Sequence, residues 1–155
     1  MSTNLFPEKY NSKPLIAVES AKRLKKIINE FFGLVLFFLG LTLFLLMVTY
    51  NTEDPSFRNA TNLNAENILG NFGSFLADPL HLALGNSTFV ISLILFIWSF
   101  RFLFKNKKKN FFKRVIYLPI SIIIFSLLFS TQPPNDNWSF PYGLGGMIGD
   151  SLLTI

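Results

Sequence analysis

Chemically reactive side chains are few in this sequence and lie far apart. The single histidine, His81, follows Asp78 by three residues, and there is no cysteine. A metal site needs several ligands at compatible spacing, so the sequence favours an ordinary histidine at a membrane interface over a metal ligand. The absence of cysteine excludes disulfides, thiol catalysis and thiolate metal sites.

The acidic residues of the region 51–87 are the other candidates for chemistry. Glu53 and Asp54 are adjacent and Glu66 lies in the same region, so two of these carboxylates could pair as a general acid and base. A catalytic acid needs burial to raise its pKa, and nothing nearby predicts burial, so we expect solvated loop charges. The sequence also lacks a phosphate-binding P-loop and a nucleophile elbow. We therefore expect a non-catalytic chain without a cofactor or metal of its own.

The apolar residues, half of the 155, form three long blocks instead of periodic stripes. Their uncharged runs are 22, 19 and 21 residues long. About twenty apolar residues at about 1.5 Å rise cover a hydrocarbon core of about 30 Å. Such blocks would leave a water-soluble fold without a polar face, so we predict an all-α, multi-pass transmembrane helical bundle. We place the spans at about 31–52, 84–102 and 113–131.

The stretch 101–114, between the second and third runs, is basic and contains no acidic residue. Its seven positive residues are Arg101, Lys105, Lys107, Lys108, Lys109, Lys113 and Arg114. Six more lie in the polar tail 1–26, whereas the loop after the first run contains only Arg58. Positively charged loops stay in the cytoplasm, so we predict a cytoplasmic tail and basic loop, with the first loop and the C-terminus outside. The end of the tail, 15–26, is expected to begin a helix that continues into the membrane.

Two glycine-containing segments are expected on the outer side. The first, at about 66–80, has apolar residues at helical spacing, which predicts an amphipathic helix that is interfacial or partly re-entrant. The second, at about 143–155, repeats its pattern of glycines and a leucine at three-residue intervals. The matching residues are Gly70, Gly73 and Leu76 in the first segment and Gly146, Gly149 and Leu152 in the second. A two-fold repeat predicts a further span, so we expect the chain to be a fragment that ends before a fourth span.

Each predicted span also carries small residues at helical spacing. They are Gly33 and Gly40, Ser92 and Ser99, and Ser126 and Ser130. Small residues let membrane helices approach one another closely. Two interpretations stay open: packing within one chain, which is the commoner use, and contacts between subunits.

The order of these features resembles one family of bacterial membrane proteins. A basic tail and a first span precede Tyr-Asn-Thr-Glu-Asp-Pro-Ser-Phe at 50–57, which contains Asp54 and Pro55. Leu-Gly-x-x-Gly-x-x-Leu-Ala-Asp at 69–78 follows, then Gly85, two spans joined by the basic loop, and a final Gly-Gly-x-x-Gly. Over about residues 20–155 the chain resembles the N-terminal membrane domain of the FtsK/SpoIIIE family of bacterial DNA translocases.

The resemblance implies that 27–155 form an incomplete four-span domain, a non-catalytic inner-membrane anchor and oligomerisation domain at the division septum. In that family a linker and a hexameric, ATP-driven motor follow, and they couple chromosome segregation to cell division. ATP, Mg and DNA would be bound only by that motor. The implied partners are further copies of the chain, possible hexamers among them, other division-site membrane proteins and the bilayer. The residues expected to be structural or to make contacts are Asp54, Pro55, Gly70, Gly73, Asp78, Gly145, Gly146 and Gly149.

The alternative is a small stand-alone multi-pass protein, such as an accessory subunit of a transporter. Ionisable residues are absent from the middle of the spans, which disfavours a carrier or pump. The reading frame after Ile155 distinguishes the two, because a fourth span and a later P-loop would support the translocase.

Overall fold

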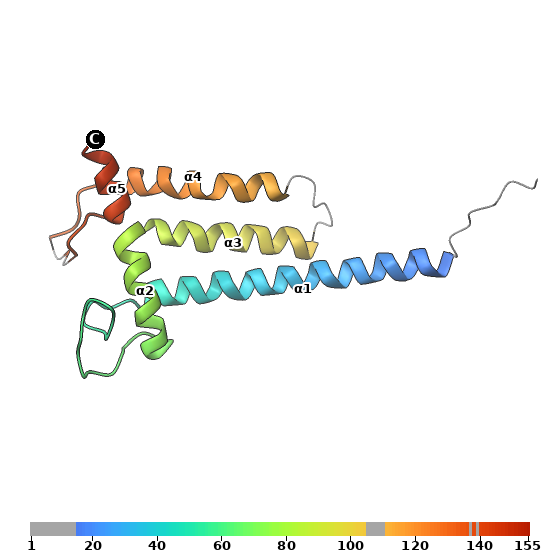
Figure 1. Cartoon of the computed structure of the whole chain (residues 1–155), viewed down its shortest axis with the longest axis horizontal. Helices are drawn as coiled ribbons and strands as arrows, with labels where there is room; N and C mark the ends of the chain where they lie inside the picture. Colours follow the sequence, from blue (N-terminus) through green and yellow to red (C-terminus); the bar gives the residue numbers. More distant parts are fainter. Residues whose placement is uncertain (1–14, 105–110, 137, 139) are drawn as a thin grey trace, which may run out of the picture.

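The computed structural model describes residues 15–104, 111–136, 138 and 140–155. In this part of the chain the fold is all-helical, and three helices are long and apolar enough to cross a membrane. They are α1 (Leu15–Val48), α3 (Ser87–Phe104) and α4 (Phe111–Ser130), which lie side by side in Figure 1. Two shorter helices, α2 (Gly70–Leu84) and α5 (Gly146–Leu153), lie across one end of this bundle. The prediction of an all-α, multi-pass helical membrane bundle is confirmed.

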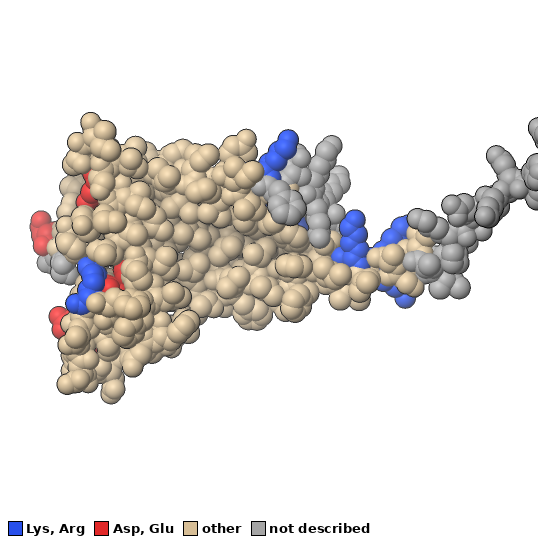
Figure 2. All heavy atoms as spheres, viewed as in Figure 1, with Lys and Arg blue, Asp and Glu red and all other residues tan. Residues whose placement is uncertain are grey.

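The two ends of the bundle differ in charge. We call the end that holds α2 and α5 the loop end, and the end where α3 finishes and α4 begins the basic end. Figure 2 shows Lys and Arg side chains at the basic end and along the projecting part of α1, and Asp and Glu side chains together with a basic group at the loop end, where Arg58 lies. Of the seven predicted topology residues, Arg101, Lys113 and Arg114 lie at the basic end, within α3 and α4. The lysines Lys105, Lys107, Lys108 and Lys109 lie outside the described residues.

Helix α1 is much longer than its neighbours. Its 34 residues correspond to about 51 Å, against about 27 Å for the 18 residues of α3. It therefore projects beyond α3 at the basic end (Figure 1), and the helix predicted for 15–26 is present. At the loop end α1 finishes at Val48 instead of the predicted 52. The reason is capping by a side chain distant in sequence: the Asn67 side-chain amide donates hydrogen bonds to the carbonyl oxygens of Leu46 and Thr49, which satisfies groups that a continuing helix would use.

Small residues bring α1 and α3 together. The Ser99 hydroxyl donates to the Gly33 carbonyl oxygen at 2.8 Å, and both belong to the predicted small-residue faces. A Cβ atom at Gly40 would lie only 3.3 Å from the Ser92 carbonyl oxygen. Phe37 packs edge-on against Phe96 in the same interface, with ring centroids 5.4 Å apart. On α1 and α3, the small residues therefore serve packing within the chain.

Helix α4 is held mainly at its two ends. At the basic end Phe111 packs against Trp98 of α3, with ring centroids 5.2 Å apart. At the loop end Ser126 donates to the Gly145 carbonyl oxygen and Ser130 donates to Asp150 at 2.6 Å, so α5 lies directly on α4. Between these contacts most of α4 is open to its surroundings, because only 6% of the residues Lys113–Ser130 are buried.

The short helices begin and end at different residues from those predicted. The first amphipathic segment is helical from Gly70 through Pro79 to Leu84, while 67–69 form the turn before it. The second is helical over Gly146–Leu153. Between α2 and α3, Gly85 has a φ of +55°, a left-handed backbone conformation that ends α2 and redirects the chain into the next span.

Candidate functional site

The loop end contains the polar groups of the fold, and Asp54 organises its first part. Its side chain is only 2% exposed, and its carboxylate accepts the backbone N–H groups of Glu66 at 2.8 Å and Asn67 at 3.0 Å. The prediction of a solvated loop charge is therefore wrong for Asp54. The loop after α1 folds back on itself, and the two backbone donors offset the loss of water around the carboxylate.

Asn67 connects this loop to both neighbouring helices. Its side-chain amide donates to the end of α1, and its Oδ1 accepts the Leu69 N–H at 3.1 Å. Gly73 packs directly over this group, since a Cβ atom there would lie 2.0 Å from Asn67 Oδ1. Gly70 serves the turn itself, because it has a φ of +61° and a Cβ atom there would meet only open space. Asn67 was not among the predicted site residues, although Asn is a typical residue just before a helix.

Pro55 is fixed from the other side. The Ser74 hydroxyl of α2 donates to the Pro55 carbonyl oxygen at 2.6 Å. Asp54 thus attaches the turn after α1 to the residues just before α2, and Pro55 attaches it to the first turns of α2.

Asp78 is the centre of a second polar cluster. Asp78 is 2% exposed, and its carboxylate accepts a hydrogen bond from the Tyr50 hydroxyl at 2.7 Å. Arg58 Nε lies 3.0 Å from each of the two carboxylate oxygens and donates to them. Arg58 Nη2 also donates to Asp78 and, at 3.1 Å, to the Tyr50 hydroxyl. Sequence reasoning treated Arg58 only as the exception to the charge pattern. Its partner lies 20 residues away, and no short motif marks that pairing.

The electrostatics of this cluster follow from burial and charge. Burial by itself raises the pKa of Asp78, but hydrogen bonds from Arg58 and Tyr50 outweigh it and hold that pKa below its usual value. Burial, followed by the neighbouring Asp78 carboxylate, raises the pKa of Tyr50. The Asp78 hydrogen bond raises the pKa of Arg58. At neutral pH the cluster is therefore an ion pair with a protonated tyrosine bound to it.

His81 lies one turn after Asp78, inside a stack of aromatic rings. Its ring centroid is 4.8 Å from that of Tyr50 and 4.3 Å from that of Phe140, and Trp138 follows at 6.0 Å. Burial lowers the pKa of His81 to about 4, and the positive charge of Arg58 acts in the same direction. Among the residues that the structure describes, no group of three His, Asp or Glu side chains could hold a metal ion.

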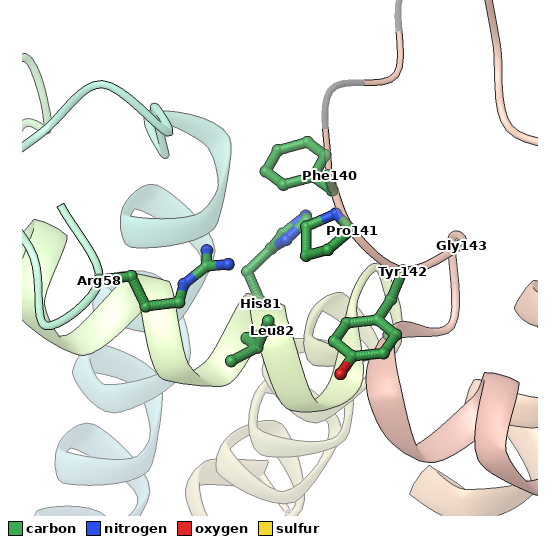
Figure 3. Close-up of a pocket in the computed structure, with 8 residues that line it drawn as sticks. Arg58, His81, Leu82, Phe140, Pro141, Tyr142 and Gly143 are labelled. Atoms are coloured by element: carbon green, nitrogen blue, oxygen red, sulfur yellow. The ribbon is translucent and has the colours of Figure 1, made fainter.

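Through this aromatic stack, the segment after α4 packs against α2. The Trp138 indole N–H donates to the Tyr142 carbonyl oxygen at 2.7 Å, and its ring packs on Phe140. Figure 3 shows Phe140 and Pro141 next to the His81 ring, Arg58 on the other side of it, and Tyr142 farther along the same segment with its ring turned away from His81. The space they enclose is about 10 Å³, which is room for about one water molecule. A wider, open groove of about 450 Å³ lies beside it, over Arg58, Asp78 and Glu53.

The second glycine segment has the same local geometry as the first. Gly146, like Gly70, has a positive φ, here +67°, and is the first residue of its helix. The next glycine again faces a neighbour, because a Cβ atom at Gly149 would lie 2.3 Å from the Ser126 carbonyl oxygen. A Cβ atom at Gly145 would lie 2.0 Å from the same oxygen. In this segment too, the small residues contact the chain itself.

Asp150 holds the second segment as Asp54 holds the first. Its Oδ2 accepts the Gly143 N–H at 2.6 Å and its Oδ1 accepts the Ser130 hydroxyl. The end of the first glycine segment contacts the start of the second. The Asn86 N–H donates to the Leu144 carbonyl oxygen at 2.8 Å, and a Cβ atom at Gly85 would lie only 2.3 Å from that same oxygen. All eight predicted site residues therefore lie at the loop end, at contacts or turns within one chain.

Comparison with known proteins gives a consistent result. Residues 25–155 match the family model described as the 4TM region of DNA translocase FtsK/SpoIIIE. A DNA translocase FtsK from Caulobacter vibrioides is 32% identical over 80% of this chain and 16% of its own length. Those from Rickettsia prowazekii and Rickettsia bellii are 30% and 34% identical over 78% and 76% of the chain, and 16% and 15% of their own lengths. The chain thus spans about 16% of the length of these relatives. No solved structure matches it significantly.

Proposed function

The chain belongs to the FtsK/SpoIIIE family of DNA translocases, as its 4TM membrane region, and we propose that it anchors a DNA-translocating motor in the bacterial inner membrane. The observation that carries this proposal is the family match over 25–155, which covers α3 and α4 completely and α1 from residue 25 onward, and so reaches each helix able to span a membrane in the described part of the chain. The ATP, Mg and DNA chemistry belongs to a motor outside this chain.

The proposed orientation places the basic end in the cytoplasm. The lysines and arginines at that end support it, because positively charged segments near membrane spans are retained inside. The loop end, with Asp54, Asp78 and the aromatic stack, then faces the outside of the inner membrane. Cysteine variants of the cysteine-free chain test this: a membrane-impermeant thiol reagent should label Asn62→Cys and leave Asn106→Cys unlabelled in intact spheroplasts. Labelling of Asn106→Cys alone would reverse the orientation.

The mechanical role of the loop end is to join the helices into one unit. Contacts of Asn67 and Asp54 fix α2 to α1, and the Tyr50–His81–Phe140 stack fixes the segment after α4 to both. A force applied through the C-terminal side of the chain would therefore be shared by all three spans instead of pulling α4 alone.

Self-association and septal location are further parts of the proposal. The glycine and serine faces are already occupied within the chain, so we assign contacts between copies to the exposed apolar face of α4. Its exposed members are Ile116, Tyr117, Ile120, Ile123, Ile124, Phe125 and Leu128. At the septum, such assemblies and other division-site membrane proteins would couple chromosome segregation to cell division.

A fractionation experiment tests the anchor directly. In the bacterium, residues 1–155 should stay with inner membranes after an alkaline carbonate wash. The full-length translocase without its whole membrane region should keep DNA-stimulated ATPase activity but move to the soluble fraction. Asp136→Asn, which changes an exposed carboxylate, is the control and should remain membrane-bound. A deleted protein that stays in the membrane would refute the anchor function.

A further inference from the structure

One face of α2, together with the turn before it, exposes large apolar side chains. The set consists of Ile68, Leu69, Phe72, Phe75 and Leu76, and we call it the α2 apolar face. Phe72 is 71% exposed, and Phe57, which is 77% exposed, packs edge-on against Phe75 with ring centroids 5.0 Å apart. None of these residues, all in the described part of the chain, is charged.

The orientation of this face is fixed by the opposite side of the helix. That side is buried and consists of Gly73, Ser74, Ala77, Asp78 and His81. Asp78 is bound by Arg58 and Tyr50, so α2 cannot rotate its apolar residues inward without breaking the ion pair. The apolar face therefore points away from the rest of the chain.

Its position connects it with the membrane. The Ile68 N–H donates to Thr49 Oγ1 at 3.2 Å, which places the start of the face beside Val48, the exposed last residue of α1. The exposed apolar surface of α1, which ends at Val48, thus adjoins the start of the α2 apolar face. In Figure 1 the first half of α2 extends sideways beyond α1, nearly at right angles to the spans. In Figure 2 this lobe shows no Lys, Arg, Asp or Glu on the side that points toward the basic end of the bundle.

We propose that the α2 apolar face inserts into the interfacial region of the bilayer leaflet at the loop end. An amphipathic helix parallel to the membrane plane buries its apolar side about 5–10 Å into the boundary between headgroups and acyl chains. Continuity with the lipid-facing surface of α1 favours lipid as the occupant over a second copy of the chain. This inference rests on the proposed anchor function and adds to it: a helix fixed across the span ends resists displacement of the bundle along the membrane normal.

Spin labelling in the cysteine-free chain tests the proposal. The chain is reconstituted in phosphatidylethanolamine–phosphatidylglycerol vesicles and labelled at Phe72→Cys, and collisions with oxygen and with a nickel chelate are compared. Oxygen concentrates in lipid and the chelate in water. We expect an oxygen-to-chelate accessibility ratio several-fold higher at Phe72→Cys than at Asn62→Cys in the exposed loop. Leu76→Cys, one turn later on the same face, should behave like Phe72→Cys.

Two outcomes would overturn the proposal. A ratio at Phe72→Cys equal to that at Asn62→Cys would place the face in water, and protection from both reagents would show that a second copy covers it. A label at Phe38→Cys, on the exposed side of α1, is the control that distinguishes failure of the interfacial role from failure of the anchor function. If Phe38→Cys is in lipid and Phe72→Cys is not, only the interfacial role is wrong. If neither is in lipid, the membrane anchor itself is refuted.

Discussion

The substitution Asp78→Asn tests the ion pair at the loop end. The variant keeps the shape of the side chain but removes the charge that Arg58 and Tyr50 bind. Hydrogen bonds to a charged group contribute about 1.5–3 kcal/mol each, so the two partners set an upper value of about 6 kcal/mol. That value is reduced because Arg58 remains 35% exposed and can return to water, and because neutral Asn costs less to bury. We expect a loss of about 2 kcal/mol in the free energy of unfolding.

The assay is thermal unfolding of the chain in detergent micelles, followed by tryptophan emission. For a chain of this size, about 2 kcal/mol lowers the melting temperature by about 4–8 °C. The matched control is Asp136→Asn, an exposed carboxylate of the same type. The double variant with Arg58→Gln completes a mutant cycle, in which the pair should show a coupling of about 1–2 kcal/mol. Strictly additive effects, or a melting temperature of Asp78→Asn equal to that of the control, would refute the ion pair as a stabilising contact.

Two further predictions concern pH and the glycines. Because burial lowers the pKa of His81 to about 4, from about 6.5 in the unfolded chain, its contribution to stability is complete above about pH 6.5 and is lost as the pH falls toward 4. The melting temperature should therefore drop across that window, and His81→Phe should flatten the drop; an unchanged slope in His81→Phe would assign the pH effect to another group. Asp78, with its lowered pKa, adds a loss only below about pH 4. Gly149→Ala places a Cβ atom 2.3 Å from the Ser126 carbonyl oxygen and should cost about 1–3 kcal/mol by overpacking, measured in the same unfolding assay. Ser151→Ala, at an exposed position of the same helix, is the control, and equal stability of the two variants would contradict the close contact.

The spans illustrate what local sequence predicts well. In lipid a backbone must satisfy its hydrogen bonds internally, so a long uncharged run has essentially one structure available to it, a helix. Helices α3 and α4 begin and end close to the expected spans, whereas α1 begins well before residue 31, in the helical end of the tail, and ends at Val48, where a distant side chain, Asn67, caps it.

The positions of the two glycine segments could be predicted from the sequence, but the contacts that their glycines make could not. The spacing of Gly70 and Gly73, and of Gly146 and Gly149, correctly indicated two related helical segments. Sequence alone left open whether small residues contact the same chain or another one. The structure shows contacts within the chain, because only the folded arrangement reveals which surface lies opposite each missing Cβ atom.

By itself, the sequence determined that this protein is helical, that the described part holds three candidate membrane spans, and to which family the chain belongs. Run length, composition and motif spacing are local properties, and they suffice for these three conclusions. Only the tertiary structure decided that Asp54 is buried, that Arg58 pairs with Asp78, and that His81 stacks between Tyr50 and Phe140. These groups come from separate loops and helices. Whether a charge is solvated or paired depends on which donors the folded chain brings within about 3 Å, and no local pattern encodes that approach.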